Sequence, residues 1–292
     1  MTKSVTRTAY YFPKTVDEAI EIKRAQGAGG QFIAGGTDLL VSLGGVRTEA
    51  LIDLSRIPAL VEISTRGSTV DIGAAVTYSQ ILQNPEIIRV VPLLGQAIRT
   101  IGGVQVRNVA TLVGNVVNAS PAADTLPALY VLNAEVHFTR GKVVLKVPIE
   151  EFIIGPGQTV LERDEIVTGI SFECPGKGWF GTFEKLGLRK SMAISVASMA
   201  VMLQVGATKA LQARMALGAV APTAIRVAEA ERLLAGADLN DKTIEAVADA
   251  ASDAARPIDD VRSTAAFRTR VIKGLVRRAL YDLRSQSMEG DW

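Results

Sequence analysis

Residues 100–124, TIGGVQVRNVATLVGNVVNASPAAD, most strongly limit what this chain can fold into. They contain three glycines and three asparagines, and their only charged side chains are those of Arg107 and Asp124. Such a composition favours tight turns and lets another group approach the backbone closely. The stretch is therefore either a series of helix stops and turns or a surface on which a large ligand lies. The residues alone leave both alternatives open.

A second glycine-rich loop, AGGTD at residues 34–38, lies between an apolar segment and a helical pattern. A strand, a diglycine turn and a helix start in this order can direct free backbone N–H groups at a phosphate. The loop lacks the third glycine of the dinucleotide fingerprint G-x-G-x-x-G. Thr37 or Asp38 could equally be a plain N-cap. Two such loops in one half of the chain favour a large phosphorylated ligand.

The rare residue types exclude several kinds of site. Cys174 is the only cysteine, so the chain forms no internal disulfide and cannot by itself ligate a cysteine-bound iron–sulfur cluster. His137 is the only histidine, which argues against a zinc site or a histidine-based triad. Its alternating surroundings predict a structural or exposed side chain on a strand. The net charge of +2 gives no electrostatic footprint for nucleic acid or anionic lipid.

The sequence shows no targeting or membrane-spanning segment. The first residues, MTKSVTRTAYYF, are polar and lack the apolar core of a signal peptide. The most apolar stretch, MAISVASMAVMLQVGA, is shorter than the roughly 20 residues that span a bilayer. We therefore expect a soluble, cytoplasmic protein.

The order of the expected elements predicts an α+β fold with two packed units. Up to residue 174, strand-like and helical segments are mixed without steady βαβ alternation. The turn-rich segment CPGKGW (174–179) is the expected boundary between domains. Three strand-like segments and three helices follow it, and the last helix is long and amphipathic. A length of 292 residues also favours two domains over one.

Three segments together resemble the FAD-binding medium subunit of molybdenum hydroxylases, the family that includes carbon monoxide dehydrogenase and xanthine dehydrogenase. They are FIAGGTDLL, RTIGGVQVRNVATLVGNVVNASPAADTLPAL and FEKLGLRKSMAIS. The resemblance covers essentially the whole chain, including PIDDVRSTAAFRTRVIKGLVRRAL near its end. It implies a two-lobed, PCMH-type FAD-binding domain over residues 1–174. It further implies a smaller C-terminal domain of antiparallel sheet and helices over residues 175–292.

The same resemblance implies which residues bind FAD, while no residue is expected to be catalytic or to bind a metal. The two glycine loops would surround the pyrophosphate, and a lysine near the flavin ring would favour the anionic reduced flavin. Val113 departs from the family pattern A-[ST]-x-G-G-N at its first glycine, and Ala123 stands where a serine is often found. The expected FAD-binding residues are Ala34, Gly35, Gly36, Thr37, Asp38, Thr100, Ile101, Gly102, Gly103, Ala110, Thr111, Gly114, Asn115, Asn118, Ser120, Asp124, Ile166 and Lys185.

The resemblance finally implies an electron-transfer subunit rather than a complete hydroxylase. [2Fe-2S] clusters are expected on a small partner subunit and the molybdopterin cofactor on a large one, in a dimer of heterotrimers. The sequence specifies neither the organic substrate nor the external acceptor, which could be NAD, a quinone, a cytochrome or dioxygen. The alternatives are a stand-alone nucleotide-binding scaffold and a self-contained flavin oxidase. No evident base stands beside the expected ring position, which disfavours the oxidase.

Overall fold

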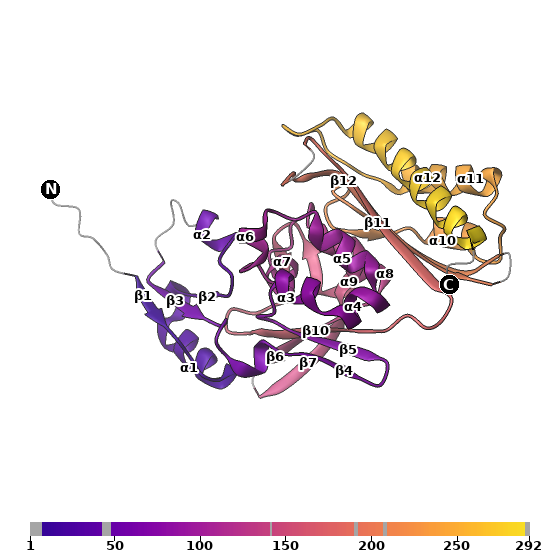
Figure 1. The fold of residues 1–292 in the computed structure, drawn as a ribbon. Helices are drawn as coiled ribbons and strands as arrows, with labels where there is room; N and C mark the ends of the chain where they lie inside the picture. The colour runs from indigo at the N-terminus through magenta and orange to yellow at the C-terminus, as the bar shows by residue number, and fades with distance from the viewer. Residues whose placement is uncertain (1–7, 43–47, 141, 190–191, 207–208, 290–292) are drawn as a thin grey trace.

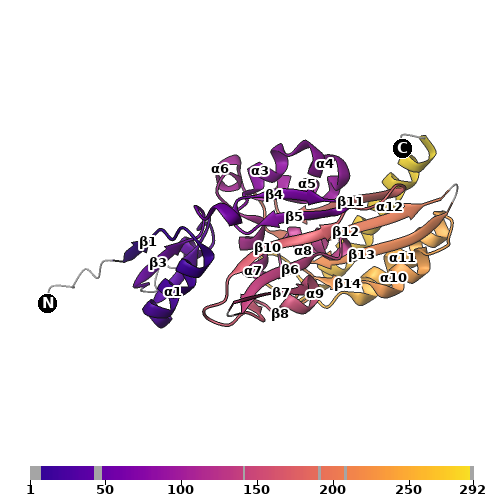
Figure 2. The ribbon, with the colours of Figure 1, turned by 90° about the horizontal axis from the view of Figure 1, so that it is seen from below.

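The computed structural model describes residues 8–42, 48–140, 142–189, 192–206 and 209–289. Lys190 and Ser191 of the third family-like segment lie outside these ranges. The three larger sheets follow one another along the molecule, with the first lobe at one end and the C-terminal sheet at the other (Figure 2). The α+β class with two lobes and a smaller C-terminal domain is confirmed.

The first lobe is a small parallel sheet. Its strands are β1 (Ala9–Tyr11), β3 (Ala50–Asp53) and β2 (Gly30–Ile33), hydrogen-bonded in the order β1-β3-β2. Helix α1 (Val16–Gln26) and the 3₁₀ turn η1 (Gly27–Gly29) connect β1 to β2, and helix α2 (Leu39–Ser42) follows β2. The sequence pattern did not single out this lobe as parallel, because its strands are only three or four residues long.

The second lobe contains a five-stranded antiparallel sheet. Its order is β4 (Ile63–Arg66), β5 (Thr69–Gly73), β10 (Val167–Glu173), β6 (Glu135–Arg140) and β7 (Val143–Pro148). Strand β10 is last in sequence but lies in the middle, so the sheet is complete only when the chain returns to it. The 3₁₀ turn η3 (Pro58–Leu60) precedes β4, and the hairpin β8 (Ile153–Gly155) and β9 (Gln158–Thr159) precedes β10.

Most helices of the second lobe lie between β5 and β6 in sequence and cover one side of the sheet (Figure 1). Two of these helices begin with a proline. Proline suits the first helical position, because an N–H group there would have no partner within the helix. The helices are α3 (Tyr78–Gln83), α4 (Pro85–Val90), α5 (Pro92–Arg99), α6 (Val104–Arg107), α7 (Leu112–Val117) and α8 (Thr125–Val131), with α9 (Ile149–Phe152) after β7.

The C-terminal domain is an antiparallel sheet with helices on its outer face (Figure 1). Strand β12 (Ser195–Val205) is buried on both faces, because Met199 and Val201 pack against the helices while Ala200 and Met202 pack toward the second lobe. This explains its uninterrupted apolar sequence. The other elements are β11 (Trp179–Gly187), β13 (Ala210–Gly218), β14 (Ile225–Arg226), α10 (Ala228–Leu234), α11 (Asp241–Ala254) and α12 (Ala265–Glu289).

Helix α8 forms much of the contact between the two domains. All seven of its residues are buried, and it lies with α5 between the second sheet and the C-terminal sheet (Figure 1). Two arginines of the C-terminal sheet donate to its last carbonyl groups, Arg226 to Tyr130 O and Arg214 to Val131 O, both at 3.2 Å. Cations at this position also match the helix dipole.

The chain leaves β10 at Glu173 and enters β11 at Trp179, so a division at residue 174 stays a prediction within this short connection. Among the described residues, no helix is long and apolar enough to cross a membrane.

Candidate cofactor site

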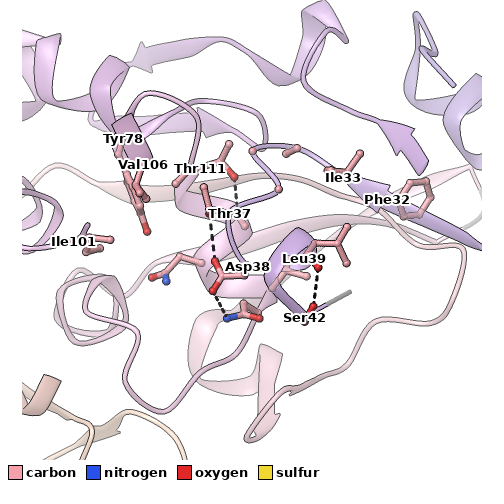
Figure 3. A pocket seen from close by; sticks show the side chains of 18 of the residues that line it. Phe32, Ile33, Thr37, Asp38, Leu39, Ser42, Tyr78, Ile101, Val106 and Thr111 are labelled. Carbon is pink, nitrogen blue, oxygen red and sulfur yellow. Dashed lines mark hydrogen bonds between the residues drawn. The ribbon is translucent and has the colours of Figure 1, made fainter. Parts of the chain in front are cut away.

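A cavity of about 510 Å³ lies where the first lobe meets α3, α6 and α7 (Figure 3). Its size is ordinary for a cofactor pocket. Both glycine-rich segments contribute to its wall, although more than 60 residues separate them in sequence. The lining residues are Gln31, Phe32, Ile33, Ala34, Gly35, Gly36, Thr37, Asp38, Leu39, Ser42, Tyr78, Ile101, Val106, Ala110, Thr111, Gly114, Asn115, Val117 and Asn118.

Direct backbone contacts hold the cavity wall together. A Cβ atom on Gly35 would lie 2.0 Å from the carbonyl oxygen of Val109, so only glycine permits this approach. Gly36 has φ 69°, a left-handed conformation that turns the loop toward α2. Thr111 forms an isolated bridge with Thr77 and caps α7 by accepting a hydrogen bond from the Gly114 N–H at 2.9 Å.

The first loop lines the cavity and carries unpaired backbone donors. Within the described parts of the chain, the backbone N–H groups of residues 35–38 donate to no protein acceptor. Unpaired backbone N–H groups in such a loop can bind phosphate oxygens. The Asp38 carboxylate accepts from Asn118 Nδ2 at 3.3 Å and from the Thr37 hydroxyl at 3.4 Å. A carboxylate repels phosphate, so Asp38 suits a ligand hydroxyl better.

Asn115 contributes an oriented amide to the lining of the cavity. Its Oδ1 accepts a hydrogen bond from the Thr125 hydroxyl at 2.5 Å. Its Nδ2 donates to no protein atom in the part of the chain that the structure describes. The amide therefore offers a donor to a ligand in the cavity.

Comparisons with known proteins identify the family of this chain. Residues 4–172 match the family described as the FAD binding domain in molybdopterin dehydrogenase, and residues 182–283 match the CO dehydrogenase flavoprotein C-terminal domain. The chain belongs to the family of FAD-binding medium subunits of molybdenum hydroxylases.

Individual relatives cover nearly the full length. The carbon monoxide dehydrogenase medium chain of Hydrogenophaga pseudoflava is 34% identical, over 94% of this chain and 96% of that one. The xanthine dehydrogenase FAD-binding subunit of Escherichia coli O157:H7 is 31% identical, over 93% of this chain and 94% of that one. A solved structure of carbon monoxide dehydrogenase from Hydrogenophaga pseudoflava has a TM-score of 0.90 at 32% identity, over 94% and 96% of the two chains.

The residues of the cavity fit the FAD of this family. Unpaired N–H groups suit the two phosphates, a carboxylate and amides suit hydroxyl and carbonyl groups, and apolar side chains suit a ring. The predicted residues that line the cavity are Ala34, Gly35, Gly36, Thr37, Asp38, Ile101, Ala110, Thr111, Gly114, Asn115 and Asn118.

Other predicted residues lie away from this cavity, and their contact with FAD stays a prediction. Ile166 is buried, and both its backbone groups bond to Thr139, its O accepting at 2.9 Å and its N–H donating at 3.1 Å. This pairing offers no free backbone group to a flavin ring. The predicted residues outside the cavity are Thr100, Gly102, Gly103, Ser120, Asp124, Ile166 and Lys185.

Lys185 and Asp124 form a buried ion pair between the two domains. The Lys185 ammonium donates to Asp124 Oδ2 at 2.6 Å, to Ala193 O at 3.0 Å and to Thr100 O at 3.3 Å. Asp124 also accepts from the Ser195 hydroxyl. Burial raises the pKa of Asp124, and Lys185 opposes that shift. In this arrangement the three ammonium protons are bonded and the charge is balanced, so a role for Lys185 at the flavin ring stays a prediction.

The departure at Val113 does not disturb the site. Residue 113 lies inside α7, and its side chain is 4% exposed in the hydrophobic core. A glycine is not needed there, because the helix requires no special backbone conformation. Sequence reasoning missed Tyr78, a residue that lines the cavity from the start of α3. The only local signal was its position directly after the capping Thr77.

Proposed function

We propose that this chain holds FAD in the cavity between its two glycine-rich loops, takes electrons from [2Fe-2S] clusters of a partner subunit and passes them to an external acceptor. The meeting of both loops at one cavity, with unpaired N–H groups at residues 35–38, carries this proposal. FAD supplies the redox chemistry when bound. The chain's own residues bind the cofactor, orient it and limit its contact with water.

Partner subunits supply the rest of the electron path. The chain has a single cysteine, which cannot ligate an iron–sulfur cluster by itself, so we place the clusters on a small partner subunit. We place the molybdopterin cofactor on a large partner subunit. Relatives named medium chains of carbon monoxide dehydrogenase and of glyceraldehyde dehydrogenase support a multi-subunit assembly. We propose a dimer of heterotrimers, and its cytoplasmic location stays a prediction.

The cofactor is tested first. The purified chain is denatured and the released cofactor is identified by mass. We expect FAD at about one molecule per chain, directly or after reconstitution. A colourless chain that binds ADP but no FAD would support the scaffold alternative instead.

Electron transfer is tested next. The small subunit is reduced with dithionite, freed of excess reductant and mixed with the FAD-loaded chain without oxygen. We expect the oxidised-flavin absorbance to fall. An unchanged flavin spectrum in a complex that has formed would contradict the proposed electron path, and turnover of an organic substrate by the chain alone would support the oxidase.

A further inference from the structure

Tyr78 places a buried hydroxyl without a partner beside the cavity. Its side chain is 1% exposed, and the residue lines the cavity on the same side as Val106 (Figure 3). Its Oη is buried and has no hydrogen bond of acceptable geometry within the described part of the chain. Buried polar groups are nearly always paired, so an unpaired one next to a ligand site calls for an explanation.

The backbone around Tyr78 fixes where this hydroxyl lies. Thr77 caps α3 by accepting from the Gln80 N–H at 3.3 Å, and the Tyr78 N–H donates to Ala110 O at 2.9 Å. The ring belongs to the hydrophobic core of the second lobe. Tyr78 is thereby tied to the segment that leads into α7, and its hydroxyl cannot turn to solvent.

The hydroxyl of Thr125 is a polar group close enough to act on the Tyr78 hydroxyl. Burial raises the pKa of the Tyr78 phenol far above its ordinary value; the Thr125 hydroxyl opposes that shift, while Asp124 and Asp38 add to it. Tyr78 therefore stays protonated and is available as a donor. Thr125 is fully buried and donates to Asn115 Oδ1 at 2.5 Å, so its own oxygen remains free to accept.

A hydrogen bond from Tyr78 to Thr125 would reinforce the orientation that the Asn115 amide already has. If Tyr78 donates to Thr125, the Thr125 proton must go to Asn115, and only Oδ1 can accept it. The Asn115 Nδ2 is then directed away from Thr125 as a donor. Helices α3, α8 and α7 supply one residue each, so this arrangement depends on how the three helices pack together.

We propose that Tyr78 is a positioning residue of the FAD site, whose hydroxyl pairs with Thr125 when FAD fills the cavity and so presents the Asn115 amide to an acceptor oxygen of FAD. This inference rests on the proposed function, because it requires FAD in this cavity. The unpaired hydroxyl of the free chain is then a cost that cofactor binding removes.

The decisive variant is Tyr78→Phe, which keeps the ring and removes only the hydroxyl. The free chain should be no less stable, because the variant removes an unpaired buried group. The Kd for FAD should rise about 3- to 10-fold, the effect of one net hydrogen bond. Flavin fluorescence titration gives the Kd and calorimetry of the free chain gives Tm. Tyr130→Phe is the matched control, a buried tyrosine of α8 outside the cavity, and should leave the Kd unchanged.

Variants of Thr125 test whether the effect passes through it. Thr125→Val should raise the Kd as Tyr78→Phe does, and Thr125→Ser should restore it. Adding Tyr78→Phe to Thr125→Val should change the Kd no further, because both substitutions interrupt the same chain of hydrogen bonds from Tyr78 through Thr125 to Asn115. Additive effects in this double variant would overturn the inference.

The outcomes also separate this inference from the function on which it rests. A Tyr78→Phe chain that is less stable when free but binds FAD with unchanged Kd would show a purely structural hydroxyl and overturn the inference. A wild-type chain that binds no FAD would refute the proposed function itself.

Discussion

At the scale of single residues, Gly35 decides whether the cavity can form. Its backbone contacts the backbone of Val109. A Cβ atom on residue 35 would lie 2.0 Å from the Val109 carbonyl oxygen, which is far below the van der Waals distance. The atom in the way is a main-chain carbonyl oxygen, which has no rotamer to change. The glycine is therefore needed for the contact between the two loops, and not only for the approach of a ligand.

Gly35→Ala should accordingly separate the loops. We expect the free energy of unfolding to fall by about 1–3 kcal/mol, as for other overpacked sites, and the Kd for FAD to rise at least tenfold. Urea denaturation and flavin titration measure the two effects. Gly176→Ala is the control, because a Cβ there meets nothing within 4 Å and its φ is not positive. An unchanged Kd in Gly35→Ala would mean that FAD binds elsewhere.

The residues of the site differ in how far the sequence could predict them. Gly35, Gly36 and Asn115 stand in two glycine-rich segments that together favour a large phosphorylated ligand, and the family resemblance implied their contact with FAD. Tyr78 has no such pattern, since its position matters only because the fold places its buried hydroxyl beside the cavity. Lys185 and Asp124 were both expected at the site, but their ion pair depends on how two domains pack, which no local pattern encodes.

At the scale of elements, the N-cap of α7 connects helix stability to the site. Thr111 caps this helix from inside the cavity wall, and Gly114, Asn115 and Asn118 on or just after α7 line the cavity. Asn240 caps α11 in the same way, by accepting from the Thr243 N–H at 3.0 Å, but lies in the C-terminal domain outside the cavity. The two caps thus share their chemistry and differ in location.

Thr111→Ala and Asn240→Ala should therefore have similar effects on stability and different effects on binding. Each should lower the free energy of unfolding by about 1 kcal/mol, the usual loss of a cap. Only Thr111→Ala should raise the Kd for FAD, by several-fold, and Thr111→Ser should largely restore it. Equal Kd values in the two alanine variants would contradict the placement of FAD against α7.

At the scale of the whole molecule, the element order, the turn-rich segment 174–179 and the length predicted two domains, but no sequence feature predicted the contacts that join them. Strand β12 has an apolar sequence because its two faces belong to two cores, one of which extends into the second lobe. The polar contacts at this boundary include those of Arg214 and Arg226 at the end of α8 and of Lys185 with Asp124 just before its start. Helix α8 is held at both ends by the C-terminal domain.

The Lys185–Asp124 pair should consequently act as one unit in holding the domains together. Lys185→Met leaves a carboxylate that is 6% exposed without its cation, which should lower the free energy of unfolding by about 3–5 kcal/mol. Lys185→Met combined with Asp124→Asn should recover much of this loss, because no buried charge remains. Urea denaturation of the single and double variants measures the coupling.

The exposed pair Arg232–Glu229 provides the control, because Arg232→Met breaks an ion pair of the same type in water and should change stability little. A double variant at Lys185 and Asp124 as unstable as the sum of the two single variants would contradict coupling across the interface. The reduction potential of the flavin gives a separate test. If it shifts in Lys185→Met but returns in the double variant, the flavin responds to the net charge at residues 124 and 185. A potential that stays shifted in the double variant would instead support the predicted place of the Lys185 ammonium near the flavin ring, because the double variant restores the net charge but not the ammonium.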